Sequence, residues 1–292
     1  MYYSLLLRKF VVAQITQLKQ KIKSIKTTKK ITHAVRLVSM SNYSKLEKQN
    51  ELLNFYQQNI HNTFFELIKT EPEWQNSTIF PQDVFDIKPL IIIVSSSKGL
   101  CGSFNSNLLR YYERTFLIEE QQMPSFIVIG TKALKFLKNK GTINIISIFE
   151  ELTSSNYIYI AEKLTELIFN TKYKFSSVSF FSNYLKNFFL QIPQKISLIP
   201  INIPSNLTSK SIEFEWEQDK NTILEFMAIN YIKSSILNIL FQSLAAESAS
   251  RFLTMDKATN NAEEYLEELT LQYNKTRQAL ITREVSELAA NF

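Results

Sequence analysis

The chain has 292 residues, of which 45% are hydrophobic and 21% charged, and its 33 Lys and Arg against 27 Asp and Glu give a net charge of +6. This composition supports a buried core and excludes a disordered or collagen-like chain. Glycine is scarce: only 4 are present where average usage would give about 20. Every Gly and Pro lies within positions 72–204, so the terminal stretches exclude an all-β sandwich or barrel, which needs frequent turns. We therefore expect a long helix over 1–71, a domain over 72–204 and a second long helix over 205–292.

The first stretch has the period of a helix. Apolar or small residues recur at every third or fourth position from Ile15 to Val38, which places them on one helical face. Lysines dominate the other faces. A stripe this narrow, with Thr32 inside it, favours a coiled-coil partner over burial in a broad core. One helix from Leu18 to about Lys69 would be roughly 75 Å long.

The middle of the chain alternates short apolar runs with helix-period segments. Strands are predicted at Leu90–Val94, Phe126–Ile129, Ile143–Phe149, Ser177–Phe181 and Lys195–Ile199, and helices from about Asn105, from Lys132 and over Tyr157–Phe169. Strands that alternate with helices indicate a Rossmann-like α/β domain with a largely parallel sheet.

The last stretch repeats the helical pattern from about Leu224 to Leu288. Its charge is opposite to that of the first stretch. Acidic residues outnumber basic ones thirteen to eight over 205–292, whereas no acidic residue precedes Glu47. The two ends should attract one another, and they can meet only if the chain folds back. We therefore expect an antiparallel coiled coil.

We expect no transmembrane helix and no secretory signal in this sequence. The longest uninterrupted apolar run, Leu90–Val94, has the length of a strand and falls far short of the roughly 18 residues that a membrane span needs. The first ten residues carry their charges after a short apolar patch, which is the wrong order for a secretory signal. They could be a helix extension, the product of a misassigned start codon, or an organellar presequence.

The loop Ser95–Asn105 lies between a predicted strand and a predicted helix, where α/β proteins place phosphate-binding loops. Lys98 precedes the glycine, and neither Gly-Lys-Ser/Thr nor Gly-x-Gly-x-x-Gly is present, so the known phosphate-loop motifs do not apply. A structural or partner-contacting turn is favoured, and nucleotide binding is the alternative.

Candidate catalytic and metal residues are few. Cys101 is the only cysteine, which excludes an intrachain disulfide and a cysteine-based zinc site and favours a reducing compartment. The two histidines, His33 and His61, would lie some 40 Å apart on one helix, so neither a nucleophilic pair with Cys101 nor a metal pair is expected. We predict no catalytic residue, no cofactor and no metal.

The basic first helix allows two interpretations. Its lysines could bind nucleic acid phosphates, but aromatic residues are absent from Thr16 to Asn42, which leaves no platform for base stacking. An acidic partner helix or protein surface explains the charge equally well. A nucleic-acid-binding coiled-coil module therefore stays open as the alternative function.

Three segments together resemble the γ subunits of rotary ATP synthases. They are KSIKTTKKITHAVRLVSMS at 23–41, GLCGSFN at 99–105, and AESASRFLTMDKATNNA at 246–262 with its continuation to Glu287. The resemblance implies a noncatalytic axle that couples ion flow, expected to be proton flow, to ATP synthesis or hydrolysis at the β subunits. Its coiled coil would lie inside the ring of α and β subunits, and its α/β foot would meet the ε subunit and the membrane c-ring. The complex would lie on the cytoplasmic side of a bacterial inner membrane or, alternatively, on the matrix side of the mitochondrial one.

The resemblance also assigns residues. Contacts with the α/β ring are implied for Lys29, Lys30, Ile31, Thr32, Val35, Arg277, Gln278 and Thr282. A place in the lower shaft and foot is implied for Arg251, Met255, Asp256, Gly99, Leu100, Cys101 and Gly102. Ser97 and Ser248 depart from the acid and the histidine that are usual in the family.

Overall fold

The computed structural model describes residues 2–71, 73–81, 87–119, 123–141, 144–170, 174–202 and 216–289. The chain divides into two compact units. The helix-pair unit comprises Met1–Ser39 and Phe252–Phe292, and the sheet unit comprises Met40–Arg251. The division falls within two long helices, which therefore contribute to both units.

The two long helices confirm the interpretation of the stretches without Gly and Pro. Helix α1 spans Tyr2–Thr70, 69 residues, and α5 spans Lys220–Ala289, 70 residues. Each would measure about 100 Å at 1.5 Å per residue. Helix α1 continues from Leu18 back to Tyr2, because the residues before Leu18 also contain no Gly or Pro.

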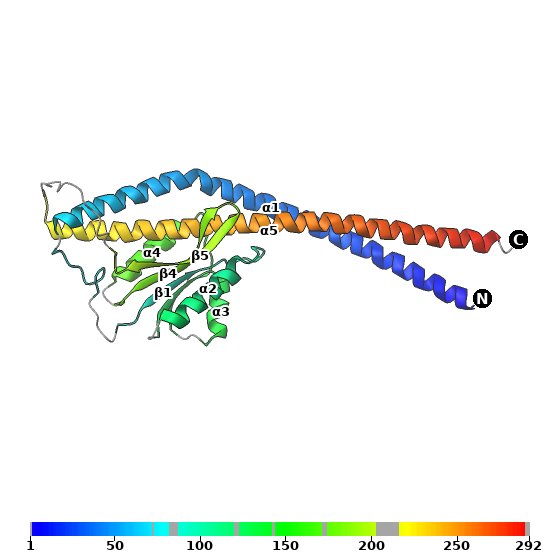
Figure 1. Ribbon diagram of the computed structural model, residues 1–292, viewed down its shortest axis with the longest axis horizontal. Helices are drawn as coiled ribbons and strands as arrows, with labels where there is room; N and C mark the ends of the chain where they lie inside the picture. Colours follow the sequence, from blue (N-terminus) through cyan, green and yellow to red (C-terminus); the bar gives the residue numbers. More distant parts are fainter. Residues whose placement is uncertain are drawn as a thin grey trace. The chain divides into compact units, whose positions relative to one another are not determined.

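In the helix-pair unit the two helices are antiparallel. The first residues of α1 and the last residues of α5 lie at the same end of this unit (Figure 1). Buried apolar side chains are sparse along the pair, among them Leu18, Met255 and Leu269. The pairing is therefore closer to a narrow seam than to a broad core.

The sheet unit contains a five-stranded sheet in the order β3-β2-β1-β4-β5. Its strands are β1 Leu90–Val94, β2 Ser125–Ile129, β3 Ile145–Phe149, β4 Val178–Asn187 and β5 Leu190–Ile199. All pairings are parallel except that of β4 with β5. This confirms the prediction of a largely parallel α/β sheet.

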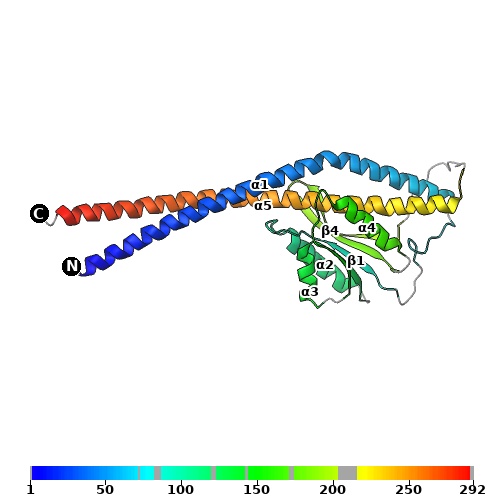
Figure 2. The same cartoon turned by 180° about the vertical axis from the view of Figure 1, so that it is seen from behind.

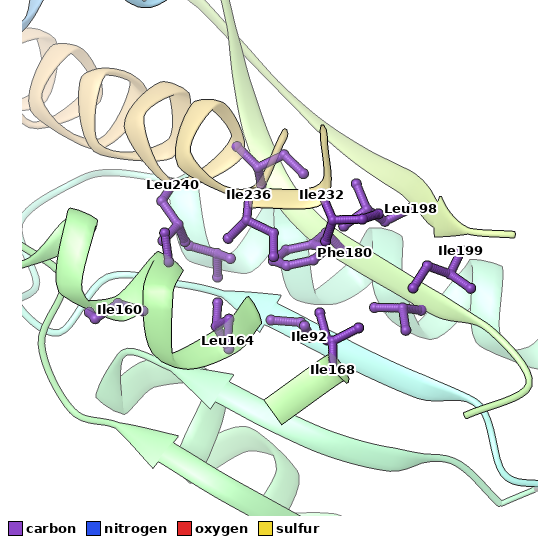
Figure 3. Close-up of a cluster of buried hydrophobic side chains, with 14 of the residues drawn as sticks. Ile92, Ile160, Leu164, Ile168, Phe180, Leu198, Ile199, Ile232, Ile236 and Leu240 are labelled. Carbon is purple, nitrogen blue, oxygen red and sulfur yellow. The ribbon is translucent and has the colours of Figure 1, made fainter. Parts of the chain in front are cut away.

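Helices cover both faces of this sheet (Figures 1 and 2). Helices α2, Phe104–Glu119, and α3, Thr131–Asn139, lie on one face, whereas α4, Tyr157–Phe169, and the first part of α5 lie on the other. Figure 3 shows the larger core, in which Ile232 and Ile236 of α5 meet Ile92 of β1, Phe180 of β4 and Leu164 of α4. This apolar layer fixes the α5 segment against the sheet.

The β4–β5 hairpin is longer than the sequence pattern predicts. Ser177–Phe181 and Lys195–Ile199 mark only the inner halves of the two strands, which the structure extends to Asn187 and back to Leu190. In the outer halves, the polar pairs Ser182–Asn183 and Lys186–Asn187 interrupt the alternation in β4, and Pro193 with Gln194 interrupts it in β5, so the apolar pattern did not reveal their full length. Antiparallel backbone pairing at the sheet edge forms them instead. Of the predicted β3 residues, Ile143 lies outside the described residues.

One described helix, α5, contains an 18-residue window apolar enough, by length and composition, to cross a membrane, with mean hydropathy 1.3. This differs from the expectation of none, because a window average tolerates the polar residues that interrupt an apolar run. Of that window, 44% is buried inside the protein, so part of its apolar character serves packing.

Candidate functional site: the helix pair and the loop 95–105

Polar contacts set the register of the helix pair. Three of them cross the seam: Lys29 Nζ to Glu263 Oε1 at 2.7 Å, Thr259 Oγ1 to Thr32 Oγ1 at 2.9 Å, and Arg36 Nη1 to Asp256 Oδ1 at 2.7 Å. As the residue numbers rise along α1, those of the partners fall along α5, which is the register of an antiparallel pair. The opposite charges of the two ends thus meet in pairs, as the sequence predicts.

These ion pairs specify the alignment more than they add stability. The hydrogen bond from Lys29 and its charge hold the pKa of Glu263 below its ordinary value. Both side chains are substantially exposed, and exposed pairs contribute little because water screens them. Thr259 is buried, and its hydroxyl also lies 2.7 Å from the Met255 carbonyl. Its polar group is therefore satisfied inside the seam.

The outer face of α5 carries exposed apolar side chains near its end. Ile281 and Val285 are 49% and 59% exposed, and they follow one another at helical spacing beside Arg277, Gln278 and Thr282, which are also exposed. We call these five residues the tip stripe. Exposed apolar residues arranged along one helix face are typical of a protein–protein contact surface.

Helix α1 also has an exposed face. Lys30 is exposed, and Ile31, Leu37 and Val38 are each more than half exposed. The other α1 residues that are predicted to contact the ring of α and β subunits are less exposed. Lys29 pairs with Glu263, Thr32 contacts Thr259, and Val35 is half-buried. The structure thus divides the predicted contact set into an outward group and a group at or near the seam.

The loop Ser95–Asn105 is held from within. The Ser96 N–H donates to Asn105 Oδ1 at 3.0 Å, and Asn105 Nδ2 donates to Ser96 Oγ at 2.8 Å and to Cys101 Sγ at 3.2 Å. Cys101 is buried. The thiol is therefore part of the loop's internal packing.

Gly130, which follows β2, allows the backbone of Ser95 at the start of the loop to approach closely. Its φ is 90°, and a Cβ at this position would lie 2.2 Å from the Ser95 carbonyl oxygen. The Ser95 hydroxyl donates to the Ile129 carbonyl at 3.0 Å and accepts from the Ala133 N–H at the same distance. Only glycine fits this close approach without displacing the backbone.

Leu100 is an exposed apolar residue of the loop. Its φ is 64°, unusual for a residue other than glycine, and its side chain is 59% exposed. A left-handed leucine costs about 1–2 kcal/mol. An apolar side chain held outward in such a conformation is suited to contact a partner.

Helix α5 anchors the other side of the loop. Ser250 Oγ donates to the Cys101 carbonyl at 2.9 Å, and Arg251 Nε donates to the Gly99 carbonyl at 3.3 Å. Arg251 also forms an ion pair with Glu247. Burial raises the pKa of Glu247, and the Arg251 charge opposes that shift. The loop and the α5 helix are therefore joined by a partly buried polar network.

The geometry of the loop does not favour phosphate binding. The N–H groups of Ser95 and Ser96, which a phosphate loop would turn toward its ligand, already donate to the Ile129 carbonyl and to Asn105. Within the described part of the chain, no group of three or more His, Cys, Asp or Glu residues could hold a metal ion. The loop thus belongs to the structure of the sheet unit.

Several contacts could not be found from the sequence. Ser250 reaches the Cys101 carbonyl across 149 positions of sequence, and no pattern in one chain signals such a pair. The exposure of Ile281 and Val285 depends on which face α5 turns toward α1. Helical periodicity places Ile281 and Val285 on the same face as Arg277, but it does not show whether that face is turned toward α1 or away from it.

The chain thus belongs to the α/β class and combines a five-stranded sheet unit with an antiparallel pair of long helices that carries exposed apolar side chains. A profile of the ATP synthase family matches residues 14–292. The ATP synthase gamma chain of Clostridium novyi is 32% identical over 280 residues, 94% of this chain and 96% of that one. That of Nautilia profundicola is 32% identical over 290 residues, 95% and 97% of the two chains. The chain belongs to the ATP synthase gamma-chain family.

Solved structures show the same fold. A rotor chain of the Euglena gracilis mitochondrial ATP synthase gives a TM-score of 0.62 at 14% identity, covering 92% of this chain and 99% of that one. A chain from the central stalk and c-ring of the Tetrahymena thermophila mitochondrial enzyme gives 0.55 at 20% identity, covering 78% and 99%. These relatives and structures give the nucleic-acid alternative no support.

Proposed function

We propose that the chain is the noncatalytic central shaft of a rotary ATP synthase, which couples ion flow through a membrane rotor to ATP synthesis or hydrolysis on neighbouring subunits. One observation carries this proposal. Polar contacts fix the register of the helix pair, while apolar side chains stay exposed on its outer faces. Family membership supports the same function, because the relatives are gamma chains and the similar structures are rotor and stalk chains.

The mechanism we propose is coupling by differential contact. A shaft shifts the conformation of a surrounding subunit only if the faces it presents interact differently with the two states of that subunit. The two helices present different faces: α1 offers Lys30 and Ile31, whereas α5 offers the tip stripe. Rotation would bring these unlike faces to each catalytic subunit in turn.

Within the tip stripe, Arg277 and Gln278 are proposed to hydrogen-bond to the ring subunits. The guanidinium of Arg277 supplies several donors in a planar fork that matches a carboxylate, and Gln278 both donates and accepts. Ile281 and Val285 would add apolar contact area. Thr282 completes the contact surface with a hydroxyl.

The segment 72–204 is proposed to be the foot that meets the ε subunit and the membrane c-ring. Leu100, held outward at the loop, and Lys98, which pairs with Glu151 at 2.8 Å, are candidate contact points. Through these partners the chain would be peripheral to a membrane. We propose the cytoplasmic side of a bacterial inner membrane, with the matrix side of the mitochondrial inner membrane as the alternative.

Reconstitution tests this function. The full chain, mixed with α and β subunits, should restore ATP hydrolysis and ATP synthesis in membranes that lack the gamma chain. The double variant Arg277→Ala with Gln278→Ala should assemble but lose most coupled synthesis. Gln272→Ala with Lys275→Ala, which changes exposed residues of α5 outside the tip stripe, is the matched control. Unchanged synthesis in the tip-stripe variant would contradict the contact assignment.

The alternative function has its own test. Tight binding of the purified chain to duplex DNA or RNA at moderate salt, with an affinity that falls steeply as salt rises, would support a nucleic-acid module. We expect only weak, nonspecific binding.

A further inference from the structure

A cavity of about 870 Å³ opens between α2 and α3, beside the start of β2. Its walls come from the second half of α2, the end of α3, Met123 and Pro124 before β2, and Asn144 before β3. The lining residues are Lys88, Arg110, Tyr112, Glu113, Arg114, Phe116, Met123, Pro124, Phe126, Phe136, Leu137, Lys140, Gly141 and Asn144. The loop 95–105 follows the carboxyl end of β1, whereas the cavity lies beside the amino ends of the parallel strands.

The inner wall of the cavity is apolar and largely aromatic. Tyr112, Phe126 and Leu137 are buried and belong to a second apolar core, which lies between the sheet and helices α2 and α3. The rings of Phe116 and Phe136 pack around Tyr112, with centroid distances of 5.5 and 6.4 Å. Rings held by one another in this way form a fixed wall that an apolar ligand can enter without first reorganising the protein.

The rim of the cavity is cationic. Four basic residues line it, and one of them, Lys140, is neutralised by Glu113 at 2.7 Å. Lys88, Arg110 and Arg114 have no acidic partner at ion-pairing distance among the residues that the structure describes. The cavity therefore combines an apolar interior with three cations at its rim that form no ion pair with the carboxylates the structure describes.

We propose that this cavity binds an amphipathic anion, namely a long-chain carboxylate whose acyl chain enters the aromatic interior while Arg110 and Arg114 bind its carboxylate. The volume lies within the range of ligand-binding pockets, about 300–1,000 Å³. Burial of an acyl chain supplies affinity in proportion to its apolar area, and arginine forks are suited to carboxylates. The inference does not depend on the shaft function, because no residue of the helix-pair unit takes part.

Chain length gives the first test. Binding of a saturated series from octanoate to palmitate to the full chain, each below the concentration at which it forms micelles, is measured by calorimetry. Affinity should rise about fourfold with each methylene until the acyl chain fills the cavity. Affinity that does not vary with chain length would overturn the proposal.

Charge gives the second test. Arg110→Gln with Arg114→Gln should weaken palmitate binding about tenfold to a hundredfold, while leaving the binding of methyl palmitate unchanged. Lys135→Gln with Lys138→Gln removes two charges from exposed positions of α3 outside the cavity and should have no effect. Equal losses in the two variants, or equal binding of acid and ester by the unaltered chain, would contradict the assignment. Retained ester binding also reports that the variant is folded.

Position gives the third test. In the variant Phe136→Trp, palmitate brominated along its chain should quench the new tryptophan, whereas Phe189→Trp, at an exposed position of the hairpin, should be unaffected. Equal quenching of both would place the acid elsewhere. Binding to anionic phospholipid vesicles without binding of monomeric palmitate would assign the rim to a membrane headgroup instead and overturn the proposal.

Discussion

Different interactions stabilise the sheet unit and the helix-pair unit internally. In the sheet unit, every residue of β1 is buried and α5 packs Ile232 and Ile236 into a continuous apolar core. In the helix-pair unit, ion pairs and a threonine pair join the helices beside a few buried apolar residues such as Met255, and large apolar side chains such as Ile31 and Val285 remain exposed. The first unit obtains its stability from its own core. The second leaves apolar area that a partner can cover, which is what a shaft inside other subunits requires.

Truncation of the core should have the largest effect. Phe180→Ala in β4 removes a fully buried ring and should lower the free energy of unfolding by about 3–5 kcal/mol. Denaturant unfolding of the full chain measures this change. Phe189→Ala, at a 77% exposed position of the same hairpin, should change it by less than about 0.5 kcal/mol. Equal losses would show that the sheet unit does not depend on the core described here.

Gly130→Ala should cost about 2–3 kcal/mol, because it combines a positive φ with a Cβ that would meet the Ser95 carbonyl. Gly141→Ala is the matched control. Its φ is also positive, but no atom lies within 4 Å of the added Cβ, so only the conformational part of the cost should remain. Denaturant unfolding of both variants separates steric contact from backbone strain. If Gly141→Ala costs as much as Gly130→Ala, the close approach at Ser95 is not important.

His61 should make the stability of the sheet unit depend on pH in the acid range. Its Nε2 lies 2.9 Å from Ser235 Oγ, its ring stacks on Tyr231, and burial lowers its pKa from 6.5 to about 4. The unfolded chain binds this proton at a higher pH than the folded chain, so stability is lost as pH falls from about 6.5 through 4. The shift corresponds to at most about 3 kcal/mol. Solvent screening of the partly buried ring should reduce the loss to about 1–2 kcal/mol.

Urea unfolding between pH 7 and pH 4 checks this expectation. His61→Gln should flatten the acid part of the stability profile, whereas His33→Gln, at an exposed position of α1, should leave it unchanged. The same slope in the unaltered chain and in His61→Gln would assign the acid sensitivity to other groups.

The polar seam should give the smallest effect. A double-mutant cycle of Arg36→Gln and Asp256→Asn should yield a coupling energy of about 0.5–1 kcal/mol that decreases as salt rises, because the pair is partly exposed. Hydrogen exchange of α1 amides before Ser39 reports the local stability. A coupling several times larger and insensitive to salt would mean that the seam, like the sheet unit, is held by buried interactions.

The elements that could be predicted from the sequence are those that local residue patterns determine. Stretches without Gly or Pro indicated α1 and α5, and apolar runs such as Leu90–Val94 indicated the parallel strands. The outer half of the β4–β5 hairpin could not be predicted, because edge pairing satisfies its backbone without an apolar pattern. Nor could the positive φ of Leu100, which depends on the contacts that hold the loop.

For the candidate site, the residue types were predicted but their surroundings were not. The resemblance selected Arg277 and Gln278, and the structure places both on an exposed helix face. It also selected Thr32, which contacts Thr259 in the seam. Helical periodicity gives the faces of each helix but not the register between two helices, because the register follows from long-range contacts such as Arg36 with Asp256.

Rotation of the chain within a reconstituted complex tests the central claim most directly. A bead attached through Lys138→Cys, an exposed position of the sheet unit, would be followed during ATP hydrolysis by immobilised α and β subunits. We expect continuous rotation in one direction, and frequent slipping or stalling under load when Arg277 and Gln278 are both alanine. Sustained hydrolysis with a stationary bead in a fully assembled complex would contradict the account.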